Sequence, residues 1–408
     1  MKVLVVNAYG PSNRGDAVLL EECLAEVRSV ISDAQLTVLV FEGSDEVRKL
    51  HPDIDWCERI GNASGVGARL KTITYMAAAW LAVRLPLPGA HWLLPPAQRR
   101  SLAAFRACDL VVSAPGGYIH DTNLAYLVAL LHIELGIALG KTVVLAPQSL
   151  GPVRSAVGRA VMAHVLRRCD RICTRESYSL QFATQALRLP GERVVPTGDS
   201  AFWNTLICTD EAVIDAELSR MGLGREEALL GVTVVGWSFP GNSTPDASYA
   251  AYVGALAEAL DEISERHNLT PVIFNQVSSD VSTAKAVQAR AKRRVVVDER
   301  SHPPDVLRGM IARSSLFLGT RFHSCIFAMM AGVPTVAITY LPKTEFIMQD
   351  LELGDRCTTI DAFDGARVTQ IFAQDLADLP QARARVAAAV NRYQTRFKRL
   401  QTVLADIM

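Results

Sequence analysis

The sequence has no excess of charge of either sign, because 42 lysines and arginines face 42 aspartates and glutamates among its 408 residues. Nothing in this balance predicts nucleic acid as a partner, and any site for an anion has to be local. The length exceeds what a single core usually holds and therefore favours two domains.

No apolar run is long enough for a membrane span. Residues 72–83 are too few, and residues 124–139 contain His132 and Glu134, so neither run supplies the roughly 20 apolar residues that a span needs. We predict two buried helices here. Trp80, in the first of them, leaves peripheral contact with a membrane surface open.

Secretory and disulfide signals are also missing. The first strand-like run, residues 3–6, is followed by the polar Asn7 and not by a small-residue cleavage site. Of the eight cysteines, the closest pair, Cys169 and Cys173, has neither zinc-ribbon nor redox spacing. We expect free buried thiols, no metal site, and a cytoplasmic protein that is either free or peripheral at the inner face of the membrane.

Several catalytic motifs do not occur. There is no Walker A sequence, no G-x-G-x-x-G after the first strand, no H-E-x-x-H and no G-x-S-x-G. Hydrolysis of nucleoside triphosphates, simple dinucleotide redox chemistry and serine hydrolysis therefore lose support.

What the sequence does contain is an alternation of short runs rich in Val, Leu and Ile with helical patterns. Continuous apolar strands joined by helices indicate parallel sheets that are covered on both faces, which predicts an α/β fold. The expected strands are residues 3–6, 36–41, 110–113, 142–146, 171–174, 229–235, 271–275, 294–297, 315–318 and 335–338.

The alternation lapses near residues 199–210, which suggests two doubly wound, Rossmann-like domains. We place the first domain at residues 1–205 and the second at 206–394. A C-terminal helix over about residues 381–404 is expected, and its end, residues 395–408, is expected to pack back on the first domain. Ligands of such folds bind beyond the carboxyl ends of the strands, here in a cleft between the domains.

The most informative segment begins where the strand at residues 315–318 ends. It reads Gly319-Thr320-Arg321-Phe322-His323-Ser324 and opens a predicted helix, where backbone N–H groups and the helix dipole favour an anion. This arrangement suits a small phosphorylated or carboxylated ligand. Arg321 and His323 taken alone are equally consistent with capping and packing a helix.

Polar or glycine-rich loops follow other predicted strands. They contain Asn13-Arg14-Gly15-Asp16, Gly116-Gly117 with Asp121, Gln148-Ser149, Arg175-Glu176, and Gly198-Asp199. Each has a structural alternative: Asp16 and Asp121 suit helix N-caps, the glycine pair suits any tight turn, and Arg175 suits a surface salt bridge as well as an anion contact.

Taken in order, these motifs and Lys343 resemble the polysaccharide pyruvyl transferase family over residues 1 to about 354. The resemblance implies a fold similar to the two-domain GT-B glycosyltransferases. It also implies transfer of pyruvate from phosphoenolpyruvate to a sugar of a cell-surface polysaccharide or exopolysaccharide, or of its lipid-linked precursor, as a ketal with release of phosphate. Phosphoenolpyruvate is then the donor substrate, and no cofactor is expected.

The resemblance also suggests roles for residues. Arg321 and His323 would hold phosphoenolpyruvate in the second domain, with Arg175 and Lys343 as further anion contacts and His323 as the proton donor. Asp16 and Asp121 are candidates for the base that activates a sugar hydroxyl in the first, acceptor-side domain. The remaining expected substrate-binding residues are Asn13, Arg14, Gly116, Gly117, Gln148, Ser149, Thr320 and Ser324.

One loop departs from the family pattern. Relatives often carry a histidine after the strand at residues 271–275, where this chain has Asn275 and Gln276. Two alternatives stay open: a GT-B glycosyltransferase that uses a nucleotide sugar, and a scaffold of envelope polysaccharide assembly without catalysis. The acceptor sugar and the oligomeric state are not predicted by the sequence.

Overall fold

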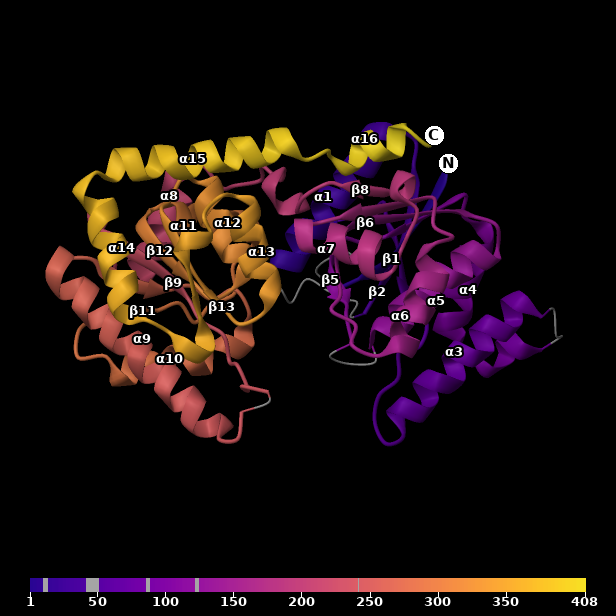
Figure 1. Ribbon diagram of the computed structural model, residues 1–408, viewed down its shortest axis with the longest axis horizontal. Helices are drawn as coiled ribbons and strands as arrows, with labels where there is room; N and C mark the ends of the chain where they lie inside the picture. The colour runs from indigo at the N-terminus through magenta and orange to yellow at the C-terminus, as the bar shows by residue number, and fades with distance from the viewer. Residues whose placement is uncertain (10–13, 42–50, 86–88, 122–124, 241) are drawn as a thin grey trace. The chain divides into compact units, whose positions relative to one another are not determined.

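The computed structural model describes residues 1–9, 14–41, 51–85, 89–121, 125–240 and 242–408 (Figure 1). The chain divides into two compact units. The first contains strand β1 together with residues 16–203 and 397–408, and the second contains residues 204–396. The predicted α/β class with two parallel sheets is confirmed.

The sheet of the first unit is parallel and runs in the order β3-β2-β1-β4-β6-β7-β8, with β5 paired to β6 beside this path. Its strands are β1 (Lys2–Ala8), β2 (Gln35–Val40), β3 (Asp55–Glu58), β4 (Leu110–Ser113), β5 (Gly116–Ile119), β6 (Thr142–Leu150), β7 (Arg171–Thr174) and β8 (Val194–Pro196).

Both faces of this sheet are buried. Alternate residues of β1 belong to different cores: Leu4 and Val6 pack with the helices on one face, whereas Val3 and Val5 pack on the other. This alternation explains why the strands read as continuous apolar runs. The described helices of the unit are α1 (Arg14–Val30), α3 (Ala68–Arg84), α4 (Pro96–Ala107), α5 (Ala125–Ala138), α6 (Ala156–Leu166), α7 (Ser177–Gln181) and α16 (Leu400–Ala405).

The C-terminal segment is attached to α1. Arg399 donates from Nε to Glu26 Oε1 at 3.0 Å and from Nη2 to Glu22 Oε1 at 2.8 Å. Leu400, Val403 and Leu404 of α16 complete the core on this face. The predicted single C-terminal helix is wrong, because it is divided into α15 (Leu379–Arg396) and α16.

The second unit has a parallel sheet in the order β11-β10-β9-β12-β13-β14. Its strands are β9 (Leu229–Thr233), β10 (Thr270–Ile273), β11 (Val296–Val297), β12 (Ser314–Gly319), β13 (Thr335–Thr339) and β14 (Cys357–Thr359). The helices are α8 (Glu211–Arg220), α9 (Pro245–His267), α10 (Val281–Arg290), α11 (Pro304–Ala312), α12 (Phe322–Met330), α13 (Pro342–Asp350), α14 (Gly365–Ala377) and α15.

Two predictions about apolar runs had different outcomes. Helix α5 is buried along most of its length, as expected. Helix α3 is not: only Ala78 and Ala79 are buried, and Leu70, Ile73 and Trp80 are exposed. None of the described helices is both long and apolar enough to cross a membrane.

The cysteine prediction holds for the closest pair. Cys169 and Cys173 are free and fully buried, and burial raises the pKa of both thiols. Within the described part of the chain, no three His, Cys, Asp or Glu side chains gather as a metal site would require.

Candidate active site

The strongest candidate site lies at the carboxyl edge of the second sheet, where β12 ends and α12 begins. The turn is fixed by β9, because the N–H of Thr320 donates to the carbonyl of Thr233 at 3.0 Å and the N–H of Arg321 donates to Thr233 Oγ1 at 3.3 Å. Arg321 is the N-cap residue of α12. The predicted sequence of strand, turn and helix is therefore present.

Arg321 is oriented by a buried carboxylate. Its Nε donates to Asp280 Oδ2 and its Nη2 to Asp280 Oδ1, both at 2.6 Å, which is the bidentate geometry that holds a guanidinium in one plane. Asp280 also accepts from the N–H of Gly236 at 3.2 Å. Burial lowers the pKa of Arg321, but hydrogen bonds to Asp280 and Tyr340 and the charges of both outweigh it, so the pKa is raised. Neither Asp280 nor Tyr340 is among the site residues predicted from the sequence.

Two further cationic or titratable groups belong to neighbouring helix starts. His323 lies in the first turn of α12 and is 6% exposed. Lys343 lies in the first turn of α13, and its Nζ is 5.9 Å from the ring centroid of Phe322. Since β12 and β13 are adjacent, two helix N-termini, Arg321, His323 and Lys343 share one stretch of the sheet edge. The edge therefore gathers basic side chains, although Arg321 is paired with Asp280 and Glu345 lies in the first turn of α13.

The burial of Thr320 and Ser324 favours a structural role over the predicted substrate contact. Thr320 is 0% exposed and its Oγ1 is 3.2 Å from the hydroxyl of Tyr252. Ser324 is also 0% exposed and donates to Gln276 Oε1. Gln276 lies in the loop where relatives often have a histidine, and here it accepts a hydrogen bond from Ser324 of α12.

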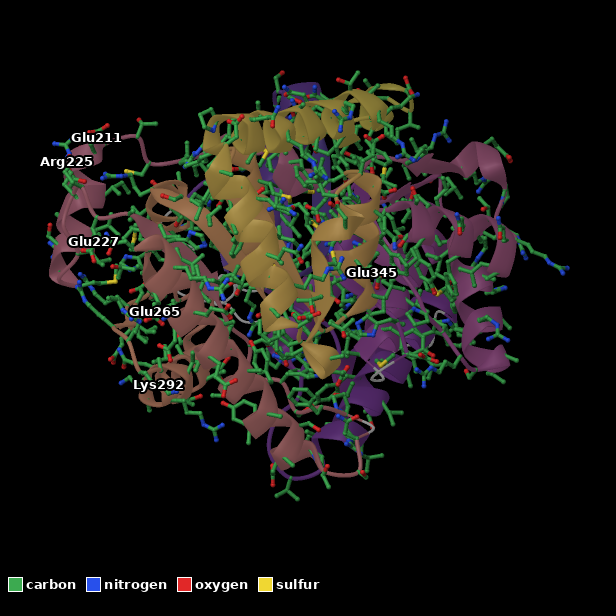
Figure 2. All side chains as sticks on the ribbon, turned by 60° about the vertical axis from the view of Figure 1, so that its left-hand side comes forward. Glu211, Arg225, Glu227, Glu265, Lys292 and Glu345 are labelled. Carbon is green, nitrogen blue, oxygen red and sulfur yellow. The ribbon has the colours of Figure 1, made fainter. Side chains whose placement is uncertain are left out.

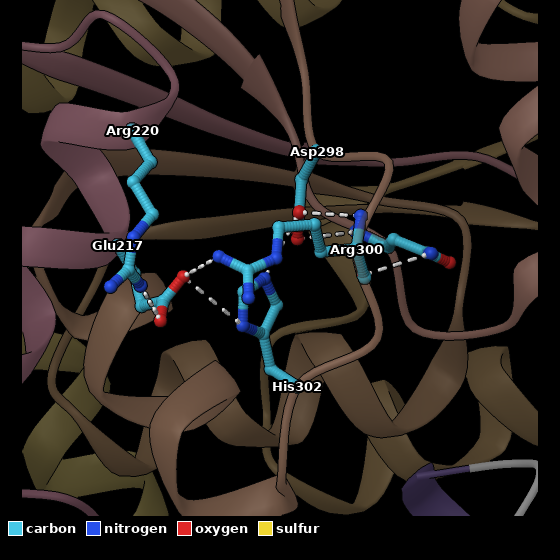
Figure 3. A network of polar contacts seen from close by, with 6 residues as sticks. Glu217, Arg220, Asp298, Arg300 and His302 are labelled. Carbon is cyan, nitrogen blue, oxygen red and sulfur yellow. Dashed lines mark hydrogen bonds and ion pairs between the residues drawn. The ribbon is translucent and has the colours of Figure 1, made fainter.

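A network of polar contacts, partly buried, reaches the loop that contains Asn275 and Gln276 (Figure 3). His302 Nε2 lies 3.0 Å from Asp298 Oδ1, and Arg300 donates to Glu217 Oε2 at 2.8 Å. The N–H of Asn275 approaches Asp298 Oδ2 at 3.4 Å. The contact of Asn275 with Asp298 connects the loops after β10 and β11, and the buried His302 is held by Asp298 beside it.

Charged side chains on the outer surface of the second unit form ordinary ion pairs. Arg225 pairs with Glu211, and Arg293 Nη2 lies 2.8 Å from Glu265 Oε1; Figure 2 labels Arg225, Glu211 and Glu265. Exposed pairs of this kind contribute little and recruit no ligand. Arg321 differs from them because its partner Asp280 is buried.

Arg175, in the first unit, belongs to a buried cluster. Its side chain is 1% exposed, and its Nε lies 3.0 Å from Asp199 Oδ2 and 3.8 Å from Glu176 Oε2. Glu176 also accepts from Ser149 at 2.9 Å, and burial raises its pKa in spite of Arg175. This burial favours a salt bridge over the predicted anion contact. The salt bridge is buried, whereas the alternative considered from the sequence was a surface pair.

The predicted loops around Gly116 and Gln148 are strands. Gly116 and Gly117 lie in β5, and β6 continues beyond residue 146 to Leu150, so Gln148 and Ser149 are inside it. Gln148 Nε2 donates to the carbonyl of Ala114 and to the hydroxyl of Tyr118, the latter at 2.9 Å. Gln148 is 0% exposed, which favours a role in holding β5.

The two candidate bases have different surroundings. Asp121 Oδ2 accepts from the N–H groups of Arg154 at 2.5 Å and Ser155 at 3.4 Å, so it anchors the start of α6. Asp16 lies inside the first turn of α1, which begins at Arg14, and is therefore not its N-cap. Asn13 lies outside the described residues, and only the backbone of Arg14 is described.

Comparison with known proteins identifies the family. The model of the family described as polysaccharide pyruvyl transferase matches residues 13–342. The chain belongs to this family. The match contains every predicted site residue except Lys343, which follows its end by one position.

The comparison also finds a relative of known name. The chain is 22% identical to the amylovoran biosynthesis protein AmsJ of Erwinia amylovora, and the alignment covers 91% of each chain. Family membership supports a transferase with a role in polysaccharide modification.

Solved structures show the fold. A UDP-GlcNAc 2-epimerase from Neisseria meningitidis is 14% identical with a TM-score of 0.62, covering 100% of this chain and 99% of that one. HepE from Anabaena, solved with UDP and glucose, is 13% identical with a TM-score of 0.59, covering 100% and 98%. At these identities the likeness confirms the expected GT-B-like architecture and says nothing of the ligand.

Proposed function

We propose that the protein transfers pyruvate from phosphoenolpyruvate to two hydroxyls of one sugar, forming a pyruvyl ketal. The observation that carries the proposal is the group of Arg321, His323 and Lys343 at the carboxyl edge of the second sheet, in a chain of the pyruvyl transferase family. Phosphoenolpyruvate carries a phosphate and a carboxylate on three carbons, and concentrated positive charge is what such a molecule requires.

The reaction balances without a cofactor. The methylene carbon of phosphoenolpyruvate takes up a proton and becomes a methyl group, while the first sugar hydroxyl adds to the central carbon and loses its proton. The second hydroxyl then displaces phosphate from the same carbon, and its proton passes to the departing phosphate. Two C–O bonds form, the C–O bond to phosphate breaks, and phosphate carries away the negative charge with its bridging oxygen.

Each residue of the site has a proposed part in these steps. His323 donates the proton to carbon, since imidazole exchanges protons near neutral pH. Asp280 holds the guanidinium of Arg321 in one plane through Nε and Nη2. Arg321 binds the phosphate or carboxylate through the N–H groups that do not bond to Asp280, and Lys343 adds a second positive charge. Asp16 and Asp121 are the two candidate bases, and one carboxylate oxygen of Asp121 already accepts the N–H groups of Arg154 and Ser155 at the start of α6.

The acceptor is proposed to be a sugar of an exopolysaccharide or its lipid-linked precursor. The similarity to a protein named for amylovoran biosynthesis supports this choice. The proposed place of action is the cytoplasm or the inner face of the membrane, where such precursors are built.

The test is incubation with phosphoenolpyruvate and candidate soluble and lipid-linked glycans, followed by measurement of released phosphate and of one added pyruvyl group per acceptor. A parallel thermal-shift series compares phosphoenolpyruvate with UDP- and GDP-sugars. Stabilisation by a nucleotide sugar alone would instead favour the glycosyltransferase alternative. Absence of turnover and of stabilisation with every ligand would favour the scaffold.

A further inference from the structure

Three neighbouring strands of the first sheet end in one row. Tyr9, Phe41 and Arg59 directly follow β1, β2 and β3, which are adjacent in the sheet. The ladder continues through them, because the N–H of Phe41 donates to the carbonyl of Ala8 and the N–H of Arg59 donates to the carbonyl of Val40, each at 3.1 Å. These residues therefore lie together on the edge where parallel α/β sheets bind their ligands.

The side chains of this row gather with Tyr118 of β5. The guanidinium carbon of Arg59 is 4.2 Å from the ring centroid of Phe41, and the ring of Tyr9 lies 6.3 Å from that of Phe41 and 5.4 Å from that of Tyr118. Phe41 is 36% exposed, so the cluster is accessible. Tyr118 is held in place by its hydroxyl, which donates to the carbonyl of Ala114 at 2.6 Å.

The charge of Arg59 is not neutralised within the described part of the chain. No described carboxylate forms an ion pair with it, and its buried Nε has no hydrogen-bond partner there. Other arginines of the unit do pair, such as Arg28 with Asp53 and Arg100 with Asp55. Burial lowers the pKa of Arg59, although the neighbouring Tyr9 opposes the shift. A half-buried guanidinium with an unsatisfied N–H is costly unless a ligand supplies an oxyanion.

We propose that Arg59, Tyr9, Phe41 and Tyr118 bind an acidic sugar of the acceptor. The planar guanidinium accommodates a carboxylate or a phosphate, and aromatic rings pack against the apolar face of a pyranose. The inference deepens the proposed function, because it gives the acceptor-side unit a preference for acceptors that carry an oxyanion. Burial raises the pKa of Tyr9; the charge of Arg59 opposes this shift, and that of Asp16, one of the two candidate bases, adds to it.

Calorimetric binding to the full-length protein tests the inference with three matched probes: cellobiouronic acid, its carboxyl-reduced form cellobiose, and cellobiose 1-phosphate. We expect the acidic probes to bind at least roughly 10-fold more tightly than cellobiose, and Arg59→Gln to remove that difference. The relative affinities of the two acidic probes tell whether a uronate or a glycosyl phosphate is preferred. Equal binding of all three, or none, overturns the inference.

Two variants serve as controls. Arg99→Gln removes an arginine that also stacks on an aromatic ring, that of Trp92 at 4.8 Å, but lies on α4, and it should keep the acidic preference. Phe41→Leu should weaken the binding of all three probes and keep their order, because it removes the ring and not the charge. Retention of the acidic preference by Arg59→Gln, or its loss in Arg99→Gln, contradicts the assignment.

The same proteins distinguish this inference from the proposed function. If wild-type protein forms a ketal, Arg59→Gln should raise the KM for an acidic acceptor roughly 10- to 100-fold and leave the KM for phosphoenolpyruvate unchanged. Ketal formation with an unchanged acceptor KM in the variant rejects only the inference. A persistent Arg59-dependent acidic preference without any release of phosphate rejects only the proposed function.

Discussion

Asp280 and Arg321 form a bidentate pair at 2.6 Å for both N···O distances, with the carboxylate buried beneath the guanidinium. The two residues come from different loops of the second sheet edge, after β10 and β12. The pair leaves the arginine charged and fixes its plane, which is what recognition of a planar or tetrahedral anion requires. Asp280 is therefore a positioning residue for the proposed donor site.

Replacing Asp280 should weaken donor binding. We expect Asp280→Ala to raise the KM for phosphoenolpyruvate roughly 10- to 100-fold, because the guanidinium loses its fixed plane. Asp280→Asn should have a smaller effect, since its amide oxygen still accepts one hydrogen bond. Steady-state kinetics measure this. Asp355→Ala, which removes an exposed partner of Arg385, is the control and should leave the KM unchanged.

His323 should matter for turnover and little for binding. We expect His323→Gln to lower kcat by a factor of roughly 10² to 10⁴ with a small change in the KM for phosphoenolpyruvate, because it removes the proton donor and keeps the anion contacts. His164→Gln, on the surface of α6, is the matched control. An unchanged kcat would rule out His323 as the donor.

The sequence predicted the donor-side turn because its signals are local. An apolar strand, a glycine and a helix start follow one another between residues 314 and 330, and each can be recognised within a few positions. Asp280 was given no role because it is 41 residues from Arg321, and nothing in the sequence indicates which acidic residue the fold brings to this arginine. Arg59 was missed for a related reason: β3 has four residues and no continuous apolar run.

The errors in the first unit also have physical causes. Gly116 and Gly117 have low strand propensity, yet β5 forms because β6 offers a paired edge and Tyr118 and Gln148 hold it. Helix α3 was predicted to be buried from the apolar run at residues 72–83, but tertiary packing and not composition decides which face is covered, and Leu70, Ile73 and Trp80 are exposed.

The role of Arg175 can be decided by removing its partner. Asp199 is 0% exposed and Arg175 is 1% exposed, so Asp199→Asn leaves a buried guanidinium without its closest carboxylate. We expect a loss of about 3–5 kcal/mol in the free energy of unfolding, measured by urea denaturation, and an unchanged KM for phosphoenolpyruvate in the protein that stays folded. Asp53→Asn, which breaks the exposed pair with Arg28, should cost no more than about 1 kcal/mol. A raised KM with little loss of stability would restore Arg175 as an anion contact.

Glu26 should make stability depend on pH in an unusual direction for a carboxylate. Burial, the largest cause, raises its pKa to about 7, although the hydrogen bond from Arg399 opposes the shift. Because the folded-state pKa lies above that of the unfolded chain, the unfolded state loses its proton first as the pH rises. The contribution of Glu26 to stability is therefore full below about pH 4.5, falls through the window up to about pH 7, and is lost above it.

Glu26→Gln should remove this dependence. Between pH 5 and pH 8 the wild-type Tm should fall more steeply than the Tm of the variant. The free energy of unfolding of the wild type should fall by about 1 kcal/mol or more beyond that of the variant over the same range. Thermal unfolding followed by circular dichroism across this range measures it, with Glu192→Gln, an exposed carboxylate of the same unit, as the control that should parallel wild type. If the Glu26→Gln and wild-type curves run parallel, Glu26 is ionised in the folded protein at all of these pH values. The pair with Arg399 would then hold the C-terminal segment as a permanent salt bridge.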